Sequence, residues 1–257
     1  MATYKIMPLN LGVYDIYASA AYYKTTPADP DLQFVYSAFA LENNETGEIV
    51  MVDAGGVPED EYEQYKSIFH PSSLVPGAPS LRQALAARNI DPTKVKTLIL
   101  THLHQDHCYG VDVFPNAKVY IQKKELQHAV TPTPCERSSY QVAPLPGLPC
   151  WMKAWGRIEC IDGDMEICDG VNVWLTPGHT PGSQMVFVET EKGQYVIVGD
   201  TYYNVPQYET GRMNGNFTNL EEWYQVRLRL KDHIKKYGTK ILCNHDPAAV
   251  VDIDYYG

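Results

Sequence analysis

The segment TLILTHLHQDHCYG, residues 97–110, places three histidines and an aspartate within six positions, directly after an apolar run. The apolar run has the length and composition of a buried strand. Polar side chains at the end of such a strand are costly to bury unless they find partners. Because imidazole nitrogens and carboxylate oxygens are common metal ligands, this cluster predicts a metal site at a strand end. Its members are His102, His104, Asp106 and His107.

Three later segments also end an apolar run with a residue that can bind a metal. VWLTPGHTPGS contains His179, VIVGDTYY contains Asp200, and ILCNHDP contains His245. With the first cluster they make seven nitrogen or oxygen ligands, more than the four of a closed structural zinc site. The seven residues suit two metals that share a bridging carboxylate.

The rest of the chain alternates predicted strands and helices in two comparable halves, which favours sheets with helices packed outside them. We interpret residues 1–257 as one domain. The turn NETG between two apolar runs predicts a hairpin, and Ser80 and Asn219 are placed to cap helices. The predicted strands are 37–43, 48–56, 95–100, 118–122, 165–170, 171–178, 183–190, 193–200 and 239–247, and the predicted helices are 79–90, 123–130 and 219–238.

Residues 131–156 contain five prolines and two tryptophans and follow neither a helical nor a strand period. Loops of this length in a compact domain are usually functional, so we expect an ordered loop that covers the active site. This loop and residues 18–36 are expected to shape the pocket, with Tyr22, Tyr23, Trp151 and Trp155 as candidate aromatic lining. Packing of the two tryptophans onto the body of the domain is the alternative. Residues 56–79 predict a mixture of helix and loop.

The charge, the apolar runs and the cysteines of the chain indicate which partners and which cellular location to expect. The net charge of -10 and the lack of a basic run longer than two lysines argue against a nucleic-acid partner. No apolar run approaches the ~20 residues that span a bilayer, and the first residues do not resemble a signal peptide. The six cysteines include no CxxC pair and indicate reduced thiols. We therefore expect a cytoplasmic protein without a membrane partner; a disulfide among the four cysteines between 135 and 168 is the alternative.

The ordered set HxHxDH, PGHTPG, GD after a strand and a final HD resembles the metallo-β-lactamase superfamily over about residues 35–246. The resemblance implies an α/β fold, a four-layer αββα sandwich. The segment VDAGG resembles the early strand motif of that superfamily, which makes Asp53 a residue that braces the histidine loop; a simple turn residue is the alternative. The resemblance also implies that His102, His104 and His179 hold one metal, that Asp106, His107 and His245 hold the other, and that Asp200 bridges them.

Within the superfamily, the sequence is most similar to N-acyl homoserine lactonases and pyridoxolactonase-type enzymes, through HLHQDHCYG, TPGHTPGSQMVFVET and the terminal NHD. Those lactonases carry a tyrosine where Tyr203 stands here, three residues after Asp200. The sequence departs from them at Cys108 and Tyr109, where they usually have small residues, and in the 131–156 loop. The resemblance implies a small-molecule substrate, either a lactone or an ester, and a homodimer is common among such enzymes.

The resemblance also implies a mechanism. Two metals can lower the pKa of a shared water to about 7, which gives a hydroxide that attacks a carbonyl carbon. Tyr203 would donate a hydrogen bond to the developing oxyanion, and Asp106 would carry a proton to the leaving group. Zinc is the expected metal, and iron, manganese or cobalt also fit these ligands. Neither Cys108 nor Cys243 is expected to bind a metal.

Four other functions share this pattern in part. A thioesterase of the glyoxalase II kind adds a helical C-terminal domain, whereas only 12 residues follow His245 here. The acidic charge disfavours a phosphodiesterase or nuclease. A diiron redox module of the flavodiiron kind typically has glutamate where His104 stands, and a non-catalytic metal sensor would not need the complete ligand set. The remaining histidines, His70, His128 and His233, are expected to have no role in the site, with His233 solvated on its helix.

Overall fold

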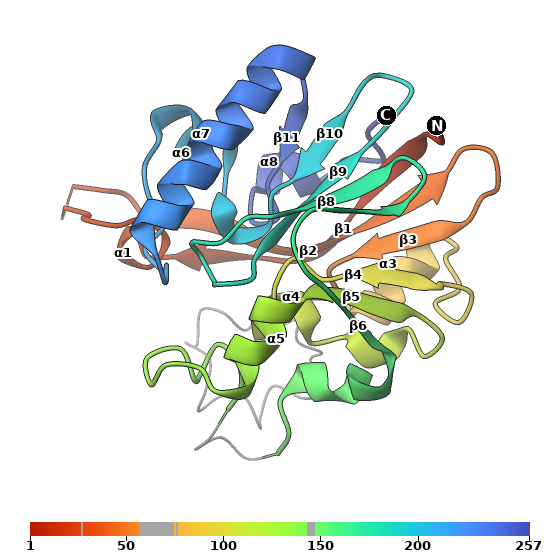
Figure 1. The fold of residues 1–257 in the computed structure, drawn as a ribbon, viewed down its shortest axis with the longest axis horizontal. Coiled ribbons are helices and arrows are strands. Elements are labelled where there is room, and N and C mark those ends of the chain that lie inside the picture. The colour runs from red at the N-terminus through yellow and green to blue at the C-terminus, as the bar shows by residue number, and fades with distance from the viewer. Residues whose placement is uncertain (27, 57–74, 76, 143–146) are drawn as a thin grey trace.

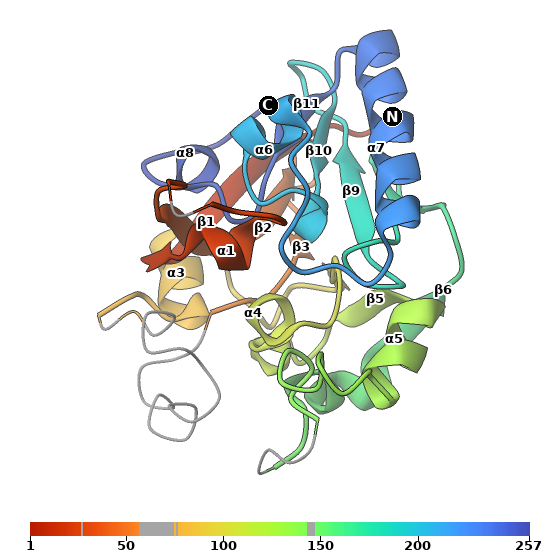
Figure 2. The same cartoon turned by 90° about the vertical axis from the view of Figure 1, so that its left-hand side faces the viewer.

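The computed structural model describes residues 1–26, 28–56, 75, 77–142 and 147–257. Two β-sheets face each other, and helices cover their outer faces (Figure 1). Both views place α7 in the upper part of the molecule and α3 and α5 in the lower part (Figure 2). The expected four-layer αββα arrangement is therefore confirmed.

The first sheet has the strand order β1-β2-β3-β4-β5-β6. The first three strands pair antiparallel, and β3 to β6 pair parallel. The predicted hairpin is the β2–β3 pair, and the Asn43 side chain accepts hydrogen bonds from the backbone of its turn, at Glu45 and Thr46. The strands are β1 (Tyr4–Ile16), β2 (Leu32–Asn43), β3 (Ile49–Val52), β4 (Thr97–Ile99), β5 (Lys118–Gln122) and β6 (Ile158–Ile161).

The second sheet has the order β11-β10-β9-β8-β7. Its neighbours pair antiparallel except β10 and β11, which are parallel. Because β8 and β10 both run opposite to β9, the carboxyl ends of β8, β10 and β11 lie at one edge of the sheet. The strands are β7 (Met165–Cys168), β8 (Val171–Leu175), β9 (Gln184–Val188), β10 (Tyr195–Ile197) and β11 (Lys240–Leu242).

The longest helix, α7 (Leu220–Tyr237), covers the outer face of the second sheet. Its buried residues follow the predicted helical spacing, and Trp223, Val226 and Leu230 pack in one cluster with Met185 and Phe187 of β9. The side chain of Asn219 accepts a hydrogen bond from the Glu222 amide, and Gly238 ends the helix at φ 70°. The predicted helix and both of its ends are confirmed.

Shorter helices cover the first sheet or lie within the loops around the site. Ser80 caps α3 (Leu81–Ala87) through a capping box with Gln83. The predicted helix over 123–130 is α5 (Lys123–Val130). Within the described ranges, the other α-helices are α1 (Ala18–Ala21), α4 (Gln105–Cys108), α6 (Val205–Thr210) and α8 (Pro247–Val250). The 3-10 helices described there are η3 (Val111–Val113), η4 (Cys150–Arg157) and η5 (Gly199–Thr201).

The structure differs from the sequence-based expectation in the 131–156 loop, and the strands and helices listed from the sequence do not include β1, β6, α1, α4, α6 or α8. The end of the expected 131–156 loop is the 3-10 helix η4, whose Trp151 and Ala154 are buried in the core outside the first sheet. Strand β6 was not predicted, because half of its four residues are exposed. Most of the 56–79 prediction lies outside the described residues. Within the described ranges, every helix is too short or too polar to span a bilayer.

Candidate metal centre

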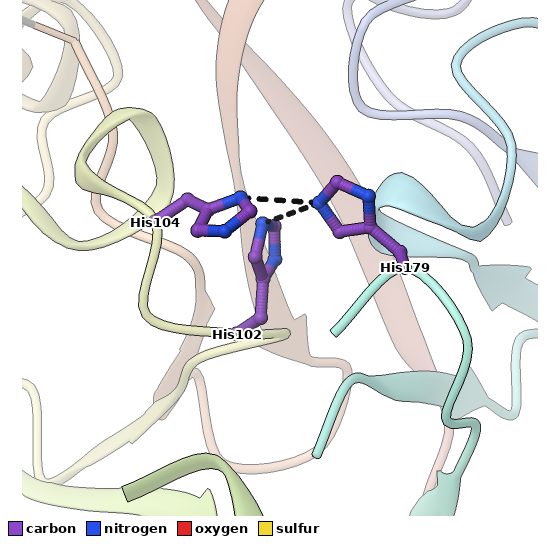
Figure 3. A group of neighbouring side chains, drawn as sticks. All are labelled: His102, His104 and His179. Atoms are coloured by element: carbon purple, nitrogen blue, oxygen red, sulfur yellow. Dashed lines mark hydrogen bonds between the residues drawn. The ribbon is translucent and has the colours of Figure 1, made fainter. Parts of the chain in front are cut away.

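Residues that follow five strand ends meet in one place: Asp53 after β3, the 101–107 segment after β4, His179 after β8, Asp200 after β10 and His245 after β11. Three imidazoles form a first group, in which His102, His104 and His179 point toward one another (Figure 3). Nε2 of His179 lies 3.3 Å from Nε2 of His102 and 3.1 Å from Nδ1 of His104. Ring nitrogens that converge so closely can share one metal ion.

A second group contains Asp106, His107 and His245. Nε2 of His107 lies 3.3 Å from Nε2 of His245. Oδ2 of Asp106 lies 3.8 Å from the first of these nitrogens and 3.6 Å from the second. The short helix α4 carries Asp106 and His107 on adjacent positions, so one turn of chain supplies two members of the group.

Asp200 lies between the two groups and presents one oxygen to each. Its Oδ2 is 3.4 Å from Nε2 of His179 and 3.9 Å from Nε2 of His102. Its Oδ1 is 3.1 Å from Nε2 of His107 and 3.2 Å from Nε2 of His245. The structure thus brings together all seven residues that the sequence suggested, with the carboxylate in the place that a bridging ligand requires.

The second ring nitrogen of four of these histidines has a hydrogen-bond partner behind it. Nδ1 of His179 and Nδ1 of His245 each lie 3.0 Å from a backbone carbonyl oxygen, of Asn216 and Val35. An N–H that donates to a carbonyl leaves the opposite nitrogen free as a ligand. His102 is backed by Thr101 at 3.1 Å, and His107 by Asp53 at 2.8 Å. The donor set therefore fits a metal, by orientation as well as by chemistry.

In the first group, electrostatics favour metal binding by two of the histidines. Burial, followed by repulsion from His107, holds the pKa of His102 well below its ordinary value. Burial, followed by repulsion from His179, does the same for the pKa of His104. Both rings are therefore neutral at pH 7, which is the form in which imidazole binds a metal.

Asp53 has the contacts that a bracing residue needs. It is fully buried, and its carboxylate accepts hydrogen bonds from the Thr101 amide at 2.7 Å, the Thr101 hydroxyl at 2.9 Å and the Asn244 side chain at 2.8 Å. With the bond to His107 it therefore joins two ligand-bearing loops, the 101–107 segment and the loop of His245. The next turn needs glycine, because a Cβ on Gly55 would lie 1.8 Å from the Asp106 carbonyl oxygen. The bracing role itself stays a prediction.

Tyr203 and Tyr202 face in different directions. The Tyr203 ring lines the pocket and lies 5.6 Å from the His245 ring and 5.1 Å from that of Phe34, between centroids. Burial, followed by the charges of Asp200 and Asp106, raises the pKa of the Tyr203 phenol well above its ordinary value, so the hydroxyl stays protonated. Tyr202 instead packs against Trp223 and accepts a hydrogen bond from Arg227. Of the two, only Tyr203 lies where it could donate to a bound substrate.

A pocket of about 220 Å³ opens over the site. The aromatic lining expected from Tyr22, Tyr23, Trp151 and Trp155 is wrong, because Tyr22 and Trp151 are buried in the core and none of the four lines the pocket. The two segments expected to shape the pocket do contribute to it, through Ala20, Phe34 and Tyr36 of 18–36 and Ser139 of 131–156. Apart from Tyr203 and the metal-site residues, the individual lining residues were not named from the sequence. The wall of the pocket consists of Tyr14, Ile16, Ala20, Phe34, Tyr36, Tyr203, Gln105, Ser139 and Asn216, beside the metal-site residues His104, Asp106, His179, Asp200 and His245.

The cysteines, together with His128 and His233, lie outside the site. All six cysteines are free, although the buried sulfurs of Cys108 and Cys150 lie 3.1 Å apart. No sulfur belongs to a candidate metal group among the described residues. His128 pairs with Glu136 at 3.0 Å. The expectation of a solvated His233 is wrong, since its ring packs on Trp174 and lies 2.7 Å from the Gln194 side-chain oxygen; His70 lies outside the described residues.

Known proteins resemble this chain in sequence. The family model of the metallo-β-lactamase superfamily matches residues 33–235. An N-acyl homoserine lactonase of Bacillus thuringiensis is 30% identical over 158 residues, 61% of this chain and 58% of that protein. AttM of Rhizobium radiobacter, named an N-acyl homoserine lactonase, is 26% identical over 171 residues, 64% of this chain and 63% of that protein. The matched segments thus span less than two thirds of either relative.

Solved structures extend the likeness of the fold to the whole chain. An N-acyl homoserine lactone hydrolase with N-hexanoyl-L-homoserine at its catalytic metal centre superposes with a TM-score of 0.77 at 24% identity, covering 100% of both chains. AidC, a dizinc quorum-quenching lactonase, superposes with a TM-score of 0.70 at 16% identity, covering 96% of this chain and 91% of its own. On the family match and the arrangement of its two sheets, this chain belongs to the metallo-β-lactamase superfamily.

Proposed function

We propose that this protein is a metal-dependent hydrolase that opens lactone rings, in the manner of the N-acyl homoserine lactonases that it resembles. The observation that carries the proposal is the position of Asp200, with one oxygen toward each group of ligands. A site that binds one structural metal has no use for such a carboxylate. The names of the relatives and of the dizinc neighbour AidC support the same reading.

In this proposal, the two groups of side chains would hold two divalent metals. His102, His104 and His179 would hold one, Asp106, His107 and His245 would hold the other, and Asp200 would be a ligand shared by the two groups. Imidazole and carboxylate ligands without thiolate suit zinc, and they also accept iron, manganese or cobalt. When bound, such a pair supplies Lewis acidity and an activated water at neutral pH.

The side chains around the metals would orient the substrate and move protons. The protonated phenol of Tyr203 would donate a hydrogen bond to the oxygen of the lactone carbonyl as negative charge develops there. Asp106 lies at the pocket surface and is partly exposed, so it can pass a proton to the departing alkoxide. Phe34 and Ile16 offer apolar contact for a substituent on the ring.

The pocket also favours an uncharged substrate. Its described lining contains neither lysine nor arginine, so it offers no cation to a substrate carboxylate. The ring-opened product carries a carboxylate, which would have only the metals to hold it.

We propose further that residues 131–156 partly cover the site within a single domain. In support, Ser139 lines the pocket, and the Tyr140 ring lies 4.7 Å from that of His104.

Metal analysis coupled to a substrate panel at neutral pH tests the proposal. We expect two metals per chain and hydrolysis of lactones in preference to linear esters and thioesters, lost on chelation and restored by zinc. Faster cleavage of thioesters than of lactones would favour a glyoxalase II-like enzyme instead. Two bound metals without turnover of any member of the panel would leave a metal-binding module and overturn the hydrolase proposal. Location in the cytoplasm and a homodimer belong to the same hypothesis and need separate measurement.

A further inference from the structure

Glu125, near the start of α5, is completely buried and accepts four hydrogen bonds. Its Oε1 accepts from the Leu103 amide and from the Tyr140 hydroxyl, both at 2.9 Å. Its Oε2 accepts from the Thr180 hydroxyl at 2.6 Å and from the Gly182 amide at 3.2 Å. Four donors thus satisfy a carboxylate that would otherwise be costly to bury.

Three of the four donors, at Leu103, Thr180 and Gly182, belong to the two loops that carry the first group of ligands. Leu103 lies between His102 and His104, and Thr180 directly follows His179. Every ligand of the first group is therefore within one residue of a hydrogen bond to Glu125. One loop follows β4 of the first sheet and the other follows β8 of the second, so Glu125 joins two segments that the sheets alone do not connect.

Close packing at Gly182 keeps the second loop on α5. A Cβ at residue 182 would lie 2.2 Å from the Glu125 backbone nitrogen and 2.5 Å from its Cα. These are backbone atoms that cannot move aside, so the last glycine of PGHTPG is required by this contact. The Thr180 amide also donates to the Ser183 hydroxyl at 3.1 Å, which fixes the turn that presents His179.

Asp53 makes the corresponding contacts on the other side of the site. It binds His107 directly and Asn244, the residue before His245, and both histidines belong to the second group. Among the described residues, the Glu125 carboxylate makes no hydrogen bond to that group. Within the same residues, Asp53 reaches the first group through Thr101, the residue before His102. The two buried carboxylates therefore divide the site between them.

We infer that Glu125 is a positioning residue that sets the geometry and the metal affinity of the first group, as Asp53 does for the second. The inference rests on the metal assignment proposed above. Glu125 does not line the pocket, so it would act through the ligand loops and not on the substrate. Residues that support ligands in this way typically change metal affinity by 10–100-fold when replaced.

Glu125→Gln tests the inference, because its amide keeps the shape but has only one oxygen to accept from the Leu103 and Gly182 amides. Zinc titration against a chelator should show one site weakened by about 10–100-fold and the other unchanged. Anomalous scattering from crystals at limiting zinc should locate the loss at His102, His104 and His179. Cobalt(II) absorption should change for that site alone. Asp53→Asn should instead weaken mainly the site at His107 and His245.

Two further variants serve as a control and as an alternative test. Glu136→Gln alters a buried carboxyl that contacts Thr133 and His128 and neither ligand loop, so both metals should bind it as they bind the wild type. Should Glu125→Gln fail to fold, Thr180→Val removes a single donor, and the first site should weaken about fivefold. Equal weakening of both sites, or unchanged binding at both, in the variant that folds would overturn the inference.

The outcomes also separate this inference from the proposed function. A wild-type protein that binds two metals but hydrolyses no lactone refutes the lactonase proposal, while the selective effect of Glu125→Gln still supports the positioning role. A wild-type protein that binds no pair of metals at these residues overturns both.

Discussion

The pocket has two ends that are built differently. Its inner end is a set of polar ligands on loops after strand ends, and four of its histidines, His102, His107, His179 and His245, have a hydrogen-bond partner behind the ring. Its outer wall comes mainly from β1, β2 and α1, with Tyr14, Phe34 and Tyr36 as its aromatic members. The Tyr14 and Tyr36 rings stack with centroids 4.4 Å apart. The contrast suggests that the inner end determines whether a bond is cleaved and the outer wall determines which molecule is accepted.

The largest effect should follow a change at the inner end. His104→Ala removes one nitrogen of the first group, and we expect loss of that metal together with a fall in kcat of roughly 10³-fold, as when several kcal/mol of Lewis-acid stabilisation are lost. Metal content and turnover measure the two effects. His128→Ala is the matched control, since His128 pairs with Glu136 outside the two groups of metal-site residues. A variant with both metals and full activity would remove His104 from the site.

A smaller effect should follow the loss of the phenol that connects the two ends. Tyr203→Phe keeps the ring packing on Phe34, and kcat should fall by about 10²-fold, or less where the metals dominate oxyanion stabilisation. The raised pKa keeps this phenol protonated above pH 10, so the alkaline limb of the rate profile should be the same in both proteins. Tyr202→Phe should leave kcat unchanged, because that phenol faces Arg227. An unaltered kcat in Tyr203→Phe would exclude Tyr203 from the mechanism.

The outer wall should affect substrate choice more than rate. Tyr14→Phe removes a buried phenol that faces Tyr36 and the charges of Asp106 and Asp200. We expect KM to rise about fivefold, the usual worth of one hydrogen bond, with kcat and metal content within twofold of the wild type. Tyr17→Phe, at a residue 60% exposed, provides the control. A large loss of kcat with unchanged KM would show that Tyr14 acts in bond cleavage, and it would contradict the division between an inner end that cleaves and an outer wall that selects the substrate.

The difference between the inner end and the outer wall of the pocket also explains which site residues could be predicted from the sequence. The seven metal-site residues stand in short motifs, and each motif follows an apolar run, so residue type and order suffice to find them. Tyr14 and Tyr36 are two of 19 tyrosines, and only the register of β1 against β2 brings them into the pocket. That register shifts between Asn10 and Val13, and a bulge of this kind exchanges which side chains face the core. Long-range pairing is needed to find them.

Glu125 shows a second limit of sequence reasoning. The helix over 123–130 was predicted, but nothing within KKELQHAV marks one charged residue as buried. Its four donors come from positions 103, 140, 180 and 182, which only the folded chain brings together. Local patterns therefore predicted most of the strands, three of the helices and the metal-site residues, while the residues that hold the ligands in place depended on contacts between elements.

The smallest effect should come from the exposed tryptophan of η4. Trp155 is 58% exposed, whereas Trp151 is 3% exposed and packs in the core outside the first sheet. Trp155→Ala should leave kcat/KM, metal content and Tm nearly unchanged. Trp151→Ala should lower the free energy of unfolding by about 3–5 kcal/mol, measured by denaturant titration, with little change in kcat for the folded fraction. If Trp155→Ala instead reduced kcat/KM more than tenfold for lactones with long substituents, η4 would form part of the wall, and the outer end of the pocket would extend to Trp155.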